Sequence, residues 1–139
     1  DRIVVGEVRG EETVDMISSA MLNGHSGSMS TGHANNPTDM LHRLETMMLM
    51  GIDLPLQAIQ RQVASPLDII IHLGRLRDKT RKVLQIVEVE GYEDGRIQTK
   101  VLYEFKEEGM KNGKIQGCLM KKNEITNKEK LLAAGYHTI

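Results

Sequence analysis

The sequence is poor in aromatic residues and in cysteine, and it has no long apolar run. Its 139 residues include one Phe, three Tyr and no Trp, so aliphatic side chains and nine Met must fill the core. The single cysteine, Cys118, excludes an internal disulfide and fits a reducing cytoplasm. No apolar run approaches the roughly 18 residues of a membrane-spanning helix. A net charge of −1 gives no bulk attraction to DNA or to an anionic membrane, so nucleic acid is not an expected direct partner.

Two short motifs stand near the start of the chain. Residues 3–10 read IVVGEVRG, and residues 24–35 read GHSGSMSTGHAN. The spacing predicts a buried strand over 1–5, a helix over 11–22 ended by Asn23-Gly24, and a second strand over 28–31. The carboxyl ends of parallel strands meet at the edge of a sheet where ligands bind in open α/β folds. A carboxylate, two histidines and several hydroxyls are therefore expected around one pocket.

The middle of the chain predicts two helices. Asn36 is the expected cap of the first, with Pro37 at its first position and Gly51 at its end. Methionines and leucines from Met40 onward form a wide apolar stripe, which is most simply core. A second helix is expected from about residue 55 to residue 65.

The remainder predicts antiparallel strands. Strands are expected over 67–73, 82–90 and 114–119, with turns around Asp78, Asp94-Gly95 and Asn112-Gly113. The apolar residues from Ile97 to Phe105 alternate with polar ones, which predicts one buried face. The stretch from Thr126 to Glu129 has the pattern of a capping box, and it would open a short helix closed by Gly135.

These motifs resemble the secretion ATPases of the type II/type IV superfamily. Glu7 matches the acidic end of their Walker B strand, and residues 24–35 match their histidine box. The resemblance continues through residues 43–83 to the closing LLAAG at 131–135, so it covers nearly the whole chain. It is closest to the pilus-assembly ATPases of the Flp/Tad type.

The resemblance implies an α/β fold: the later half of a RecA-like P-loop NTPase domain, with helices around a partial sheet, a C-terminal antiparallel β appendage and a short terminal helix. Composition shifts near Gly91, so residues 1–91 are expected to form the ATPase core and residues 92–139 the appendage. The family's phosphate-binding loop, GxxxxGK[ST], does not occur in these residues. We therefore expect the carboxy-terminal part of a longer ATPase, which alone neither binds ATP tightly nor hydrolyses it.

Glu7 and His33 are the candidate catalytic residues. A carboxylate that follows a buried strand suits the orientation of the water that attacks a γ-phosphate, near Mg²⁺. His33 holds the position of the second histidine in the box, which faces the nucleotide in the family. The alternative for Glu7 is a carboxylate exposed at a strand end.

Three further residues are candidates for nucleotide binding or γ-phosphate sensing: His25, Thr31 and Arg9. His25 matches the first histidine of the box, or it is a turn residue. Thr31 either orients His33 or satisfies local backbone groups. Arg9 pairs with Glu7, reaches a phosphate across a subunit boundary, or is solvated.

The arginines, the glycines and the possible metal ligands have open or simpler interpretations. Interface, nucleotide and surface roles are open for Arg43, Arg75 and Arg77. The glycines of the 24–35 motif lack the lysine and spacing of a phosphate cradle, so tight turns with close backbone approach are favoured. No direct metal ligands are expected, because one cysteine and no HExxH spacing argue against zinc.

The resemblance implies an ATP- and Mg²⁺-dependent motor that powers pilus assembly or type II/IV secretion. It implies a cytoplasmic hexamer, peripheral to the inner membrane through a membrane platform protein. The chain alone exposes an open sheet edge, for which a swapped dimer is expected. Two alternatives are open: a conjugation or type IV secretion motor for DNA or effectors, and a non-catalytic interaction module that kept the fold.

Overall fold

The computed structural model describes residues 2–21, 25 and 27–137. Within these ranges no helix is both long and apolar enough to cross a membrane. The predicted helix stop at Asn23-Gly24 lies outside the described residues, as do residues 24 and 26 of the histidine-containing motif.

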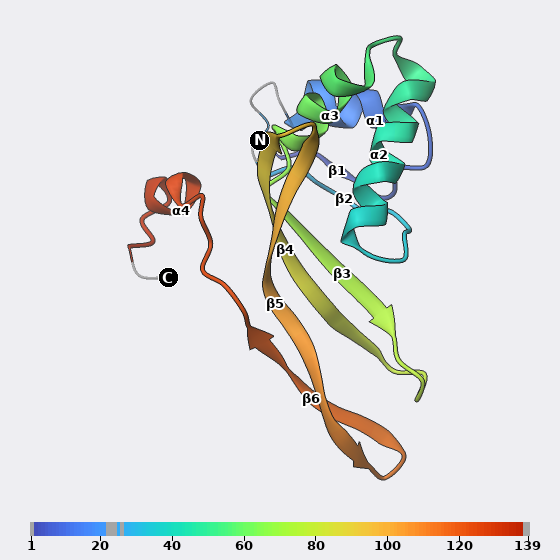
Figure 1. Ribbon diagram of the computed structural model, residues 1–139, viewed down its shortest axis with the longest axis vertical. Coiled ribbons are helices and arrows are strands. Elements are labelled where there is room, and N and C mark those ends of the chain that lie inside the picture. Colours follow the sequence, from blue (N-terminus) through green and yellow to red (C-terminus); the bar gives the residue numbers. More distant parts are fainter. Residues whose placement is uncertain (1, 22–24, 26, 138–139) are drawn as a thin grey trace.

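The first two strands form a parallel pair. β1 (Val4–Val5) lies beside β2 (Met29–Ser30). The helical segment between them consists of α1 (Glu12–Val14) and the π-helical η1 (Asp15–Met21). The predicted order of strand, helix and strand is confirmed, but the predicted burial of the first strand is wrong, because Val4 is 67% exposed. Parallel pairing places the carboxyl ends of both strands at the same edge, as can be followed in Figure 1.

The two predicted helices of the middle region are present. α2 (Pro37–Gly51) begins as predicted, because the Asn36 side chain accepts a hydrogen bond of 2.8 Å from the backbone N–H of Asp39. α3 (Leu56–Ala64) follows after a short connection that contains Pro55.

The helices and the chain around β1 share one apolar core. Met47 and Met48 of α2 are fully buried, at 2% and 0% exposure, and Met40 packs against the same cluster. The predicted burial of the methionine stripe, which was expected to run from Met40 to Met50, is therefore confirmed for Met47 and Met48 and wrong for Met50, which is 63% exposed. The buried members of the cluster are Val8, Met16, Ile17, Leu41, Leu44, Met47, Met48, Ile59 and Val63.

The second half of the chain forms a four-stranded antiparallel sheet in the order β3-β4-β5-β6. Its strands are β3 (Ile69–Arg75), β4 (Arg81–Glu93), β5 (Arg96–Lys111) and β6 (Lys114–Lys121). In Figure 1 the sheet extends away from the helices, and the β5–β6 hairpin forms its far end.

The predicted turns between these strands are confirmed. Asp94 and Gly95 have φ values of 51° and 78°, and Asn112 and Gly113 have 51° and 71°. Two successive residues with positive φ are typical of the tight turns that match the twist of a hairpin. The expected domain boundary at residue 91 falls within β4, and it stays a prediction.

The predicted regular alternation along β5 is wrong. Thr99, expected on the buried face, is exposed, whereas Leu102 is only 5% exposed. Val87 pairs with Val101 and Ile86 pairs with Tyr103, so Leu102 is an extra residue in the ladder. A bulge of this kind shifts the phase of the side chains on either side of it.

The predicted capping box before the last helix is also wrong. α4 (Glu129–Ala133) begins after Lys128 without a side-chain cap. The backbone N–H of Thr126 instead donates to the carboxylate of Glu88, on β4. A long-range carboxylate thus takes the place that the local pattern assigned to the carboxylate of Glu129.

Candidate functional site

The carboxyl ends of β1 and β2 are joined beyond the two strands. The N–H of Val8 donates to the carbonyl of Thr31 at 3.0 Å, and Val8 is 4% exposed. The hydroxyl of Thr31 donates to the carbonyl of Gly6 at 2.5 Å. Because these bonds lie on both sides of Glu7 in the sequence, they hold its backbone beside β2. Thr31 therefore acts on the backbone, which is one of the two roles considered for it.

Glu7 is the centre of a polar group at this edge. Its carboxylate lies 2.5 Å from a guanidinium nitrogen of Arg9 and 3.2 Å from Nε2 of His33. The side chains of Arg9 and His33 are 74% and 80% exposed, and that of Glu7 is 22% exposed. The structure thus brings together both candidate catalytic residues, with the imidazole open to solvent.

The charge of Glu7 follows from these neighbours. The hydrogen bond from Arg9 lowers the pKa of the Glu7 carboxyl, and the positive charges of Arg9 and Arg43 act in the same direction. Partial burial opposes the shift but does not outweigh it. Glu7 is therefore an ionised carboxylate at neutral pH, as an acceptor or orienting group for water requires.

Two residues outside the candidate set support this group. Arg43 of α2 donates from Nη1 to the carbonyl of His33 at 2.9 Å, which fixes the backbone that carries the imidazole. Glu12 accepts hydrogen bonds from the N–H groups of Arg9 and Gly10, at 2.5 and 3.0 Å. The sequence left the role of Arg43 open and missed Glu12. The spacing of Glu12, three residues after Arg9, resembles a capping box and is the signal that would have found it.

A shallow depression of about 390 Å³ adjoins His33. It is lined by His33, Ala34, Asn35, Asp39 and Arg43. Its rim combines an imidazole, an amide, a guanidinium and one carboxylate, which suits a polar ligand with anionic groups.

His25 lies at the other end of the parallel pair. Its carbonyl accepts hydrogen bonds from the N–H and the hydroxyl of Ser28, at 3.2 and 2.6 Å. Ser28 in turn accepts a bond of 3.1 Å from the N–H of Ile3. The backbone of His25 therefore shapes the turn that enters β2, near the start of β1 and away from the edge that carries Glu7. Its predicted part in nucleotide sensing stays a prediction.

At two glycines of the 24–35 motif, a larger side chain would be strained or crowded. Gly27 has a φ of +83°, and a Cβ on Gly32 would lie 2.5 Å from the terminal methyl of Met40. The interpretation as a tight turn is thereby confirmed at Gly27, whereas the neighbour of Gly32 is a flexible side chain and not the backbone.

The other two arginines whose roles were open, Arg75 and Arg77, lie in the antiparallel sheet and its first turn, away from Glu7. Arg77 forms an ion pair with Glu107 of β5, and Arg75 is the last residue of β3. Across residues 2–21, 25 and 27–137, no three His, Cys, Asp or Glu residues are grouped as metal ligands would be.

The fold and this edge define an α/β protein with an ionised carboxylate and a histidine at the ends of two parallel strands. A sequence model of the family described as type II/IV secretion system protein matches residues 1–130. The chain therefore belongs to this family, and the resemblance noted from the sequence is confirmed at that level.

Curated relatives come from conjugation and secretion systems. A Mycobacterium tuberculosis protein provisionally assigned to conjugal transfer is 38% identical over 103 residues, or 74% of this chain and 28% of that protein. Conjugal transfer protein TrbB of Rhizobium radiobacter is 31% identical over 108 residues, or 78% of this chain and 32% of that protein. The chain thus spans about a third or less of the length of these relatives.

A solved structure shares the fold. The VirB11 ATPase from the type IV secretion system of Brucella suis, in complex with sulphate, matches with a TM-score of 0.57 and 31% identity. The match covers 61% of this chain and 26% of that one. The expected α/β fold class is confirmed.

Proposed function

We propose that this chain forms part of an ATP-hydrolysing motor that powers pilus assembly or type II/IV secretion. The observation that carries the proposal is the ionised Glu7 carboxylate, in contact with His33 and Arg9 where two parallel strands end. In α/β proteins such an edge is where ligands bind, and phosphoryl transfer requires positioned charges there. Membership in the secretion family supports the same assignment.

Each residue at this edge is proposed to have its own role in ATP hydrolysis. Glu7, kept ionised by Arg9, would orient or polarise the attacking water. His33, exposed beside the depression, would donate a hydrogen bond to the γ-phosphate or to the water. Thr31 would hold the backbone that carries Glu7, and Arg9 would either keep pairing with Glu7 or turn to a phosphate. His25 would sense the nucleotide through the turn before β2.

The residues present fit one side of a site for ATP and Mg²⁺. A partly exposed carboxylate near arginine and histidine suits a phosphate chain with its cation, and the bound nucleotide would supply the phosphoryl group. The lysine and hydroxyl of a phosphate-binding loop are not among these 139 residues, so we assign them to other parts of the working protein.

The working assembly is proposed on the same basis. Motors of this kind act as rings, so we propose a hexamer that lies on the cytoplasmic side of the inner membrane and transmits motion to a platform protein there. A swapped dimer of the chain alone stays a prediction. We favour pilus assembly of the Flp/Tad type from the sequence pattern.

A second candidate function, the transport of DNA or effectors, is supported by a specific observation. The relatives described above carry names from conjugal transfer and type IV secretion. A conjugation or type IV secretion motor for DNA or effectors is therefore the alternative to a pilus motor.

ATP turnover by the natural gene product that carries this sequence tests the proposal. We expect turnover with Mg²⁺, and a loss of about 100-fold or more in Glu7→Gln while nucleotide binding persists. Glu11→Gln serves as the matched control, because it makes the same change at an exposed carboxylate four residues away. A correctly folded oligomer without turnover would contradict the motor and favour a non-catalytic interaction module.

A further inference from the structure

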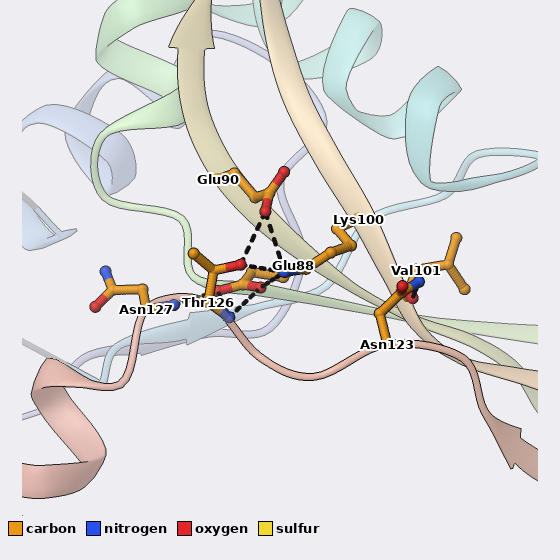
Figure 2. Close-up of polar contacts among 7 residues, drawn as sticks. All are labelled: Glu88, Glu90, Lys100, Val101, Asn123, Thr126 and Asn127. Carbon is orange, nitrogen blue, oxygen red and sulfur yellow. Dashed lines mark hydrogen bonds and ion pairs between the residues drawn. The ribbon is translucent and has the colours of Figure 1, made fainter.

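The chain that follows β6 crosses the sheet as an extended segment before α4. We call residues 122–136 the strap. The N–H of Lys122 donates to the carbonyl of Leu102 at 2.7 Å, and the side-chain amide of Asn123 donates to the carbonyl of Val101 at 2.7 Å. These bonds hold the start of the strap beside β5 at the bulge described above, and Figure 2 shows Asn123 next to Val101.

A buried carboxylate holds the middle of the strap. Glu88 of β4 is 2% exposed. Its two oxygens accept bonds from the N–H of Thr126, at 2.9 and 3.1 Å, and one of them accepts a bond of 2.8 Å from the N–H of Asn127. Lys100 of β5 lies 3.5 Å from the same carboxylate (Figure 2). Glu88 and Lys100 thus form a site for the two successive backbone amides of Thr126 and Asn127.

The charge of Glu88 is needed for this contact. Burial raises the pKa of Glu88, but the amides of Asn127 and Thr126, together with Lys100, lower it by more. The folded state therefore contains a buried, ionised carboxylate whose compensation comes largely from the strap. Without the strap that carboxylate would lose most of its hydrogen bonds to the protein, and water would have to replace them.

The strap has little apolar attachment. α4 contains no buried residue, and Leu132 and Tyr136 are 49% and 63% exposed. The contact that α4 itself makes is again polar, with Nζ of Lys130 2.5 Å from the Asp68 carboxylate. A five-residue helix is also too short to be stable in isolation. Segments with few buried apolar contacts are those that open locally while the rest of a fold stays intact.

The strap and the helices occupy opposite faces of the sheet. Ile70 of β3 packs against the helical core and pairs with Val87. Glu88 follows Val87 and pairs with Ile69, so it points to the other face. Detachment of the strap therefore leaves the packing of α2 and α3 on the sheet unchanged.

We propose that Glu88 is the anchor of a detachable strap, in which residues 122–136 bind the sheet through the amides of Thr126 and Asn127 and release as one unit. Release uncovers Glu88 and Lys100 on the face opposite the helices. The attachment is governed by polar contacts rather than by the apolar core, and the acceptor buried most deeply among them is Glu88.

Hydrogen exchange of the complete 139-residue chain, read by mass spectrometry, tests this. In the unchanged protein, peptides from the strap should exchange faster than those from residues 81–105. Glu88→Gln should raise strap exchange by about tenfold or more, with less than about a twofold change in residues 81–105. Glu90→Gln is the matched control: Glu90 is exposed and contacts Thr126 only through the hydroxyl, so its strap exchange should stay within about twofold.

A second pair of variants covers the case in which Glu88→Gln destabilises the whole sheet. Asn127→Pro removes the N–H that Glu88 accepts and leaves the sheet untouched, whereas Asn127→Ala keeps that N–H. Faster exchange confined to the strap in the proline variant, and not in the alanine variant, would support the anchor. Strap exchange at the rate of residues 81–105 in the unchanged protein, or no response to either Glu88→Gln or Asn127→Pro, would overturn it.

Discussion

The carboxylate of Asp78 accepts a hydrogen bond of 2.7 Å from the backbone N–H of Ile115, which is 37 residues further along the chain. Asp78 stands in the turn between β3 and β4, and its other oxygen accepts bonds from the N–H and hydroxyl of Thr80. Ile115 is 2% exposed and lies on β6. A single turn residue thus fastens the first hairpin of the sheet to its last strand.

This relationship predicts a pH dependence. The hydroxyl of Thr80 and the amide of Ile115 lower the pKa of Asp78 from 3.8 to about 2. Because the folded state has the lower pKa, the contribution to stability is complete above pH of about 4 and is lost as the pH falls toward about 2. Asp78→Asn should lower the melting temperature at pH 7 and flatten its dependence on pH in that window. Equal slopes for both proteins between pH 2 and pH 4 would contradict the assignment.

The Glu7 group gives a prediction at the candidate site itself. Since the hydrogen bond from Arg9 is the largest cause of the low pKa of Glu7, Arg9→Ala should raise that pKa. Arg9→Lys should raise it less, because a charge remains nearby. Titration of the Glu7 carboxyl carbon by NMR measures both. An unchanged titration in Arg9→Ala would mean that another group sets the charge of Glu7.

The features that the sequence predicted correctly are those encoded by neighbouring residues. Asn36, Pro37 and Gly51 mark the bounds of α2, and the turn at Asn112-Gly113 follows from the conformational needs of two residues. The edge that carries Glu7 and His33 could be predicted because strand, helix and strand follow one another within about 30 residues. A right-handed connection of that kind brings the two strand ends together.

The features that the sequence missed depend on residues far apart in the chain. Leu102 is buried because β4 and β5 pair with a bulge, and no local pattern on β5 reports that register. The capping box at Thr126 does not form because Glu88, 38 residues earlier, accepts the backbone N–H that Glu129 was expected to accept. Competition between a local and a distant acceptor is decided by packing, which the sequence of the last helix does not contain.

Burial of the methionine stripe predicts a large core effect. Met48 is 0% exposed within the main cluster, so Met48→Ala should lower the free energy of unfolding by about 2–5 kcal/mol. Met50→Ala, at a position 63% exposed, should change it by less than about 0.5 kcal/mol. Urea unfolding followed by circular dichroism measures the difference. Similar midpoints for the two variants would show that the stripe is not packed as described.

The cap of α2 predicts a smaller effect with a conservative rescue. Asn36→Ala removes the acceptor for the N–H of Asp39 and should lower the free energy of unfolding by about 1 kcal/mol. Asn36→Asp keeps an oxygen acceptor at the same place and should be nearly neutral, because a negative charge also suits a helix N-terminus. Urea unfolding of the unchanged protein, Asn36→Ala and Asn36→Asp measures these differences in the free energy of unfolding. A loss in Asn36→Asp as large as in Asn36→Ala would mean that the cap does not contribute through its side-chain oxygen.

Alanine is expected to be poorly tolerated at Gly117 and well tolerated at Gly32, although both glycines have close neighbours. A Cβ on Gly117 of β6 would lie 2.3 Å from the carbonyl oxygen of Lys106 and 2.7 Å from the ring of Phe105. The backbone of β5 cannot move away without breaking the ladder, so Gly117→Ala should displace the β5–β6 hairpin. On Gly32 the nearest atom would be the terminal methyl of Met40, which can rotate away, so Gly32→Ala should cost much less. Amide chemical shifts across β6 provide the measurement: broad changes in Gly117→Ala beside an unchanged hairpin in Gly32→Ala are expected. An intact hairpin in both variants would show that β5 and β6 are less closely paired at this point.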